Sequence, residues 1–123
     1  MKNLFILIDL SDENTFEYNK NTFLDFAKKL GKLNFIDVSK LVNLETKINV
    51  KSIDKRFFVV QPKNLKEFKS NITINNSIFM YCINTTFKYF SINFLISRKK
   101  VENFIVSNLG YNPENYNYTK KKI

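Results

Sequence analysis

The fold is decided by a stretch near the start of the chain, Asn3-Leu4-Phe5-Ile6-Leu7-Ile8-Asp9-Leu10-Ser11-Asp12. Its apolar residues follow one another without alternation and give way to polar residues from Asp9 onward. A continuous apolar run is typical of a strand buried on both faces, as in parallel sheets covered by helices. The stretch therefore predicts a central strand whose carboxyl end opens onto the crevice where α/β proteins bind ligands.

The composition favours one globular domain. The chain has 123 residues, is 44% hydrophobic and contains thirteen Phe, enough for a sizeable core. Its single cysteine, Cys82, excludes an internal disulfide and fits a reducing, cytoplasmic compartment. The absence of histidine argues against zinc, haem and His-based triads, so no metal or cofactor is expected.

The charge is strongly positive and unevenly spread. The net charge is +9, and the region from Phe68 to Ile123 has eight basic but only two acidic residues. We favour compositional bias, because Lys, Asn, Ile and Phe are all abundant. The alternative interpretation is functional: Arg98, Lys99 and Lys100 would form a basic patch that contacts the inner face of an anionic membrane. Nucleic-acid binding is disfavoured, because the aromatic residues are not interleaved with basic ones as in RNA-binding sheets.

The rest of the chain alternates between predicted strands and helices. A helix is expected over Asn19–Leu30, after a polar loop over Ser11–Glu17, because Phe23, Phe26, Ala27 and Leu30 form one apolar stripe. Gly31 then provides the usual left-handed cap. No element is predicted over Glu45–Lys55. Further strands are expected over Leu33–Val38, Arg56–Gln61, Ser77–Ile83 and Asn103–Ser107, and further helical segments over Ser39–Leu44, Asn64–Ser70 and from Thr85 or Thr86 to Lys100.

These elements predict an α/β fold with a doubly wound, mostly parallel five-stranded sheet. The expected strand order is 3-2-1-4-5 with helices on both faces, as in Rossmann-like or flavodoxin-like proteins. Residues 1–110 would form this single domain. Residues 111–123 would form a polar, lysine-rich tail, or the truncated start of a linker to a second domain.

Candidate ligand-facing residues come from the carboxyl ends of strands. They are Asp9, Ser11, Asp12, Asn108 and Gly110.

No catalytic residue can be assigned among them. A dinucleotide fingerprint needs three closely spaced glycines after a strand, and the chain has two glycines far apart. A phosphoacceptor receiver domain needs an Asp after the third strand and a Lys after the fifth. Here the third strand ends in Gln61-Pro62 and the fifth in Ser107-Asn108.

Several segments share a pattern with a known family. They are Asn3–Asp9, the second strand running into Phe35–Leu41, the Gln61-Pro62 exit, and the loop Asn108–Pro113. Taken together, the chain resembles the amino-terminal Rossmann-like half of a GT-B glycosyltransferase of bacterial surface-polysaccharide synthesis. In that family the carboxyl-terminal half holds the sugar-nucleotide donor, and the amino-terminal half faces the acceptor.

The resemblance implies the acceptor-side half of a glycosyltransferase-like protein, inactive alone. Its acceptor would be a glycan or a lipid-linked molecule, and its partner a missing carboxyl-terminal domain or a separate chain. The alternative is a small non-enzymatic α/β binding or regulatory domain. Such a domain would have a receiver-like or flavodoxin-like fold without the phosphoacceptor or flavin-binding residues.

Overall fold

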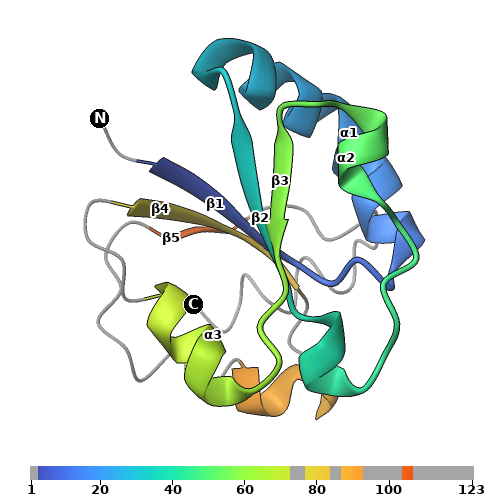
Figure 1. Ribbon diagram of the computed structural model, residues 1–123, viewed down its shortest axis with the longest axis vertical. Helices are drawn as coiled ribbons and strands as arrows, with labels where there is room; N and C mark the ends of the chain where they lie inside the picture. The colour runs from blue at the N-terminus through green and yellow to red at the C-terminus, as the bar shows by residue number, and fades with distance from the viewer. Residues whose placement is uncertain (1–2, 73–76, 84–86, 93–103, 107–123) are drawn as a thin grey trace.

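The computed structural model describes residues 3–72, 77–83, 87–92 and 104–106, and these residues form a parallel sheet with helices packed on it (Figure 1). The prediction of an α/β fold with a parallel sheet is confirmed. The sequence interpretation of residues 111–123 lies outside the described residues.

Within the described residues the strands follow the order β3-β2-β1-β4-β5, and all neighbours are parallel. β1 lies between β2 and β4, so that Phe5 is opposite Asn34 on one side and Phe79 on the other. β3 lies at an edge of the sheet and pairs with β2. The strands are β1 (Asn3–Ile8), β2 (Leu33–Asp37), β3 (Phe57–Val60), β4 (Ser77–Cys82) and β5 (Phe104–Val106).

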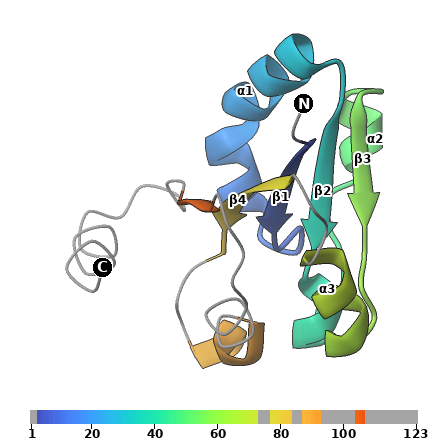
Figure 2. The same cartoon turned by 90° about the vertical axis from the view of Figure 1, so that its left-hand side faces the viewer.

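Helical segments connect the strands and cover both faces of the sheet, as Figures 1 and 2 show. Side chains of α1 and α2 pack in the hydrophobic cluster of one face, and side chains of α3 and η2 in the cluster of the other. The segments are α1 (Glu13–Leu30), η1 (Ser39–Val42), α2 (Val50–Ile53), α3 (Leu65–Ile72) and η2 (Phe87–Tyr89), where η denotes a 3-10 helix.

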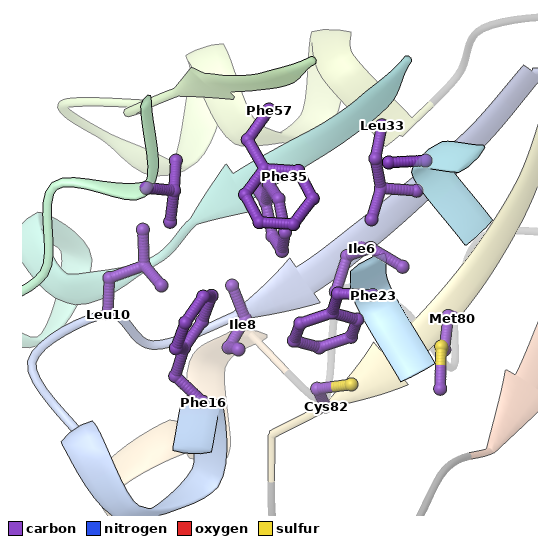
Figure 3. Close-up of a cluster of buried hydrophobic side chains, with 12 residues drawn as sticks. Ile6, Ile8, Leu10, Phe16, Phe23, Leu33, Phe35, Phe57, Met80 and Cys82 are labelled. Atoms are coloured by element: carbon purple, nitrogen blue, oxygen red, sulfur yellow. The ribbon is translucent and has the colours of Figure 1, made fainter. Parts of the chain in front are cut away.

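The side chains of β1 show why its sequence is apolar without alternation. Successive side chains of a strand point to opposite faces. Ile6 and Ile8 therefore belong to the cluster beneath α1 (Figure 3), whereas Leu7 belongs to the cluster beneath α3 and η2. All three are fully buried. Cys82 of β4 is also buried beneath α1, as a small residue of the same cluster.

Aromatic rings fill the core beneath α1. The Phe35 ring meets the Phe23 ring and the Phe57 ring nearly edge-on, with centroids 5.2 Å apart in both pairs. Phe16 lies 6.2 Å from Phe35 and 5.6 Å from Phe23. Phe35 thus links α1 to the neighbouring strands β2 and β3.

Replacing Phe35 by alanine should lower the free energy of unfolding by about 3–5 kcal/mol, because a fully buried ring leaves a cavity and removes three aromatic contacts. Leu30→Ala changes a side chain that is 43% exposed and should lower the free energy of unfolding by less than about 1 kcal/mol. Urea unfolding followed by circular dichroism measures both. Equal losses for the two variants would contradict this view of the core.

The start of α1 differs from the sequence prediction. The helix begins at Glu13, six residues earlier than expected, so the predicted polar loop over Ser11–Glu17 is wrong. Asp12 is the N-cap: its carboxylate accepts hydrogen bonds from the Thr15 N–H at 3.3 Å and from the Thr15 hydroxyl at 2.8 Å. The earlier start buries Phe16, which extends the apolar stripe of the helix by nearly two turns.

The end of α1 follows the prediction only in part. Gly31 adopts the left-handed conformation (φ 83°) and its N–H donates to the Ala27 carbonyl, as a C-cap should. Leu30, predicted to face the core, is instead exposed. The helix projects past the sheet at this end, so its last turn has no strand beneath it (Figure 1).

A charged turn joins α2 to β3. The Asp54 carboxylate accepts hydrogen bonds from Arg56 Nε at 2.9 Å, from Arg56 Nη2 at 2.7 Å and from the Arg56 N–H at 2.8 Å. These bonds lower the pKa of Asp54 from 3.8 to about 2. The Asp54 carbonyl also accepts from the Phe57 N–H, so the same turn starts the edge strand.

Because the pKa of Asp54 is lower in the folded state, its carboxylate stabilises the fold above pH 3.8, and this stabilisation is lost as the pH falls toward 2. Asp54→Asn should therefore make the free energy of unfolding less dependent on pH between about 4 and 2. Denaturant titrations over this range measure the slope. An unchanged slope in the variant would contradict the assignment.

Candidate functional site

The exits of the two central strands β1 and β2 carry the same short motif. Asp9-Leu10-Ser11 follows β1, and Asp37-Val38-Ser39 includes the last residue of β2. In each motif the serine N–H donates to the aspartate two residues earlier, at 2.9 Å for Ser11 and 3.0 Å for Ser39. Each serine hydroxyl donates to the same carboxylate, at 2.5 Å and 3.0 Å respectively. The motif turns the chain sharply where each strand ends.

Asp37 is the more deeply buried of the two acids, with 0% exposure. Its Oδ1 accepts from the backbone N–H of Leu10 at 2.9 Å as well as from Ser39. Its Oδ2 accepts from the hydroxyl of Thr46 at 2.5 Å and from Gln61 Nε2 at 2.9 Å, in addition to the Ser39 hydroxyl. A buried carboxylate requires such donors, and here they come from the exits of β1, β2 and β3.

Asp9 is 2% exposed and satisfied by a different set of groups. Its Oδ2 accepts a short hydrogen bond from the Tyr89 hydroxyl, and Lys88 Nζ lies 3.7 Å from the same oxygen. Burial, and then the bond to Asp9, raise the pKa of Tyr89 above its ordinary value, so the phenol stays protonated as a donor. Lys88 Nζ also lies 5.2 Å from the Tyr89 ring centroid.

The two carboxylates do not form an acid–base pair. Asp37 lies on the same face as Phe35 because it is two positions further along β2, and it bonds to Thr46 and Gln61 on that face. Asp9 bonds to Tyr89, which packs in the cluster of the opposite face. Each carboxylate has its own donors, so both serve to hold the strand exits in place.

An open pocket of about 310 Å³ lies beside Asp37, between the end of β3 and the segment that leads into α2. Its polar side chains are Thr46, Lys47, Asn49 and Gln61. Its apolar side chains are Leu10, Ile48, Val50 and Val59. The pocket lies near the carboxyl ends of parallel strands, which is the edge of the sheet where α/β proteins bind ligands.

Asp37 fixes the orientation of the Gln61 amide in this pocket. A carboxylate only accepts hydrogen bonds, so the Gln61 nitrogen must face it. Gln61 Nε2 also donates to the Thr46 hydroxyl oxygen at 2.6 Å, and that hydroxyl donates onward to Asp37. Both amide hydrogens are thus used, and Gln61 Oε1 accepts no hydrogen bond within the described residues.

Three of the sequence-predicted site residues can be placed. Asp9 and Ser11 bond to each other, and Asp12 caps α1, so all three stabilise the exit of β1. None of them lines the pocket. Outside the described residues lie Asn108, Gly110 and the predicted basic patch at Arg98, Lys99 and Lys100.

Sequence reasoning missed Asp37 and the pocket. The repeated Asp-x-Ser motif could have identified Asp37 as a second strand exit. The pocket could not be found in this way, because Thr46 and Lys47 belong to a stretch without helical or strand periodicity.

The part of the chain that the structure describes contains no group of three or more His, Cys, Asp or Glu placed to hold a metal ion. Among the same residues, no helix has both the length and the apolar character to cross a membrane. Comparisons with protein-family models, with curated proteins and with solved structures found no match to this chain.

Asp37→Asn should lower the free energy of unfolding by about 1–3 kcal/mol. The side-chain amide nitrogen of the asparagine would face hydrogen-bond donors that now point at a carboxylate oxygen. Asp25→Asn, which removes an exposed ion pair to Lys29, should cost less than about 0.5 kcal/mol. Urea unfolding of the two variants tests this difference. Equal stabilities would mean that the Asp37 network contributes nothing beyond a surface pair.

Proposed function

We propose that this chain is a ligand-binding α/β domain that holds a hydroxylated ligand in the pocket beside Asp37. The Gln61 amide carries the proposal, because its nitrogen is fixed and its Oε1 is available to accept from a ligand hydroxyl. Lys47 supplies a cation for an acidic group on the ligand, and Leu10 and Val59 supply apolar wall. A sugar or sugar phosphate combines these features in one molecule.

The same chemistry supports a more specific proposal, that of the acceptor-side half of a glycosyltransferase-like protein of cell-surface polysaccharide synthesis. In this proposal the fold is Rossmann-like, and the pocket holds the glycan or lipid-linked acceptor. A second domain or a partner chain supplies the donor site and the chemistry. The resemblance in the strand segments and the choice of polar groups in the pocket support it. A cytoplasmic location at the inner face of the membrane belongs to the same proposal.

A receiver-like regulatory role is less well supported. Phosphoryl transfer to a receiver domain needs an accessible carboxylate at a strand end. Asp9 and Asp37 are buried and bonded to neighbouring donors, and the exit of β3 carries Gln61, whose amide is bonded to Asp37.

Binding can be tested by thermal unfolding with methyl glucoside, glucose 1-phosphate, UDP-glucose and UDP-N-acetylglucosamine. A ligand at one hundred times its Kd stabilises a fold by about 2.7 kcal/mol, which raises the Tm of a domain of this size by more than about 5 °C. We expect at least one of these sugars to raise the Tm. The absence of any shift would contradict the binding of sugars.

Two pocket variants locate the site. Lys47→Ala and Asn49→Ala change exposed side chains that have no side-chain hydrogen bond or ion pair within the described residues, so the fold should keep its stability. Each should reduce the shift caused by the bound sugar. Lys28→Ala on α1 removes the same charge outside the pocket and should leave the shift unchanged. Equal shifts in all three variants would place the ligand elsewhere.

A further inference from the structure

The exposed edge of the sheet at β3 has unusual composition. Phe58, Val59 and Val60 are each 42% exposed, and none of the four strand residues is charged or a proline. Natural edge strands are normally protected by charged residues, proline or covering segments, because their free backbone groups pair with other chains. In Figure 1, β3 is the outermost strand on its side of the sheet.

Two residues of β3 have backbone groups that face away from β2, and one of them has neither its N–H nor its carbonyl hydrogen-bonded within the described residues. The Arg56 carbonyl accepts from the Leu33 N–H at 2.8 Å, so Arg56 faces β2. The direction alternates along a strand, which makes Phe58 and Val60 face β2 and makes Phe57 and Val59 face outward. The Phe57 N–H is taken by the Asp54 carbonyl. Among the residues that the structure describes, Val59 therefore has both its N–H and its carbonyl without a hydrogen-bond partner.

The surroundings of this edge are basic. Lys51, Lys55 and Lys63 are exposed, and none of them forms an ion pair with an acid within the described residues. Lys51 Nζ lies 4.6 Å from the Phe58 ring centroid, which brings a cation beside the strand. Two acids lie nearby: Asp54 is paired with Arg56, and the Glu67 carboxylate accepts a hydrogen bond from the Lys63 backbone N–H at 2.6 Å. A second copy of this chain would bring the same lysines against these, which disfavours pairing between two β3 edges.

We propose that β3 binds an extended, acidic segment of a partner protein, which adds to the sheet as a further strand next to Val59. Main-chain hydrogen bonds to Val59 would supply part of the affinity, and exposed Phe58 and Val60 would contact apolar side chains of the segment. Acidic side chains of the segment would meet the three lysines. The inference depends on the strand order and the charges, and it holds whether or not the pocket binds a sugar.

A fluorescein-labelled eight-residue peptide of alternating valine and glutamate is a suitable probe, measured by fluorescence anisotropy with the full chain. We expect saturable binding that weakens with added salt, and binding at least tenfold weaker for the matched valine–lysine peptide. Equal binding of the two peptides, or binding of neither, would overturn the proposal.

Variants of the protein separate the contribution of main-chain hydrogen bonds to peptide binding from the contribution of the lysine charges. Val59→Pro removes the outward N–H without removing a bond to β2 and should weaken binding at least tenfold, whereas Val59→Thr should keep it. Circular dichroism checks that both variants fold.

Charge variants test peptide binding without the Val59→Pro substitution. Replacing Lys51, Lys55 and Lys63 together by glutamine should also weaken peptide binding at least tenfold. The same change at Lys20, Lys28 and Lys29 on α1 alters the net charge equally and should have little effect. If both triple variants bind alike, or if the chain dimerises through β3 in sedimentation experiments and excludes the peptide, the proposal is wrong.

Discussion

The buried carboxylate of Asp37 is the interaction that holds together the end of the sheet where the candidate site lies. It accepts hydrogen bonds from Leu10 after β1, from Ser39 after β2, from Gln61 after β3 and from Thr46 in the segment before α2. A carboxylate that is removed from water is stabilised by such donors, so the network connects the ends of three neighbouring strands. The loops at the carboxyl ends of these strands are thereby held together although they have little regular structure of their own.

This constraint also shapes what the site can do. Because Asp37 and Asp9 are occupied by internal donors on opposite faces of the sheet, neither is offered to a substrate as an acid or a base. The network forms one wall of the pocket, in which the Gln61 amide nitrogen faces Asp37 and the Gln61 oxygen accepts no hydrogen bond within the described residues. Such a wall suits recognition of a ligand. Val59 of the edge strand β3 also lines the pocket, so a pocket ligand and a partner strand would lie close together.

Sequence periodicity predicted some elements well and others poorly. The continuous apolar run of β1 identified a strand between two others, because only a strand covered on both faces buries every side chain. The equally apolar run at β3 looked the same in the sequence, yet three of its four residues are substantially exposed. The start of α1 was misplaced because Asp12 and Glu13 resemble a polar loop until the burial of Phe16 is known.

The sequence by itself determined the α/β class, the parallel sheet and the two-sided burial of β1, since these follow from local apolar patterns and the chain length between them. It also marked Asp9 as the point where the first strand gives way to polar residues. Only the tertiary structure decided that Asp37 joins three strand exits, that Thr46 and Gln61 come together, and that β3 is an exposed edge. The bonding partners of Asp37 lie up to 27 residues away along the chain. Such contacts depend on strand order and on the face toward which each side chain points, which no short stretch of sequence specifies.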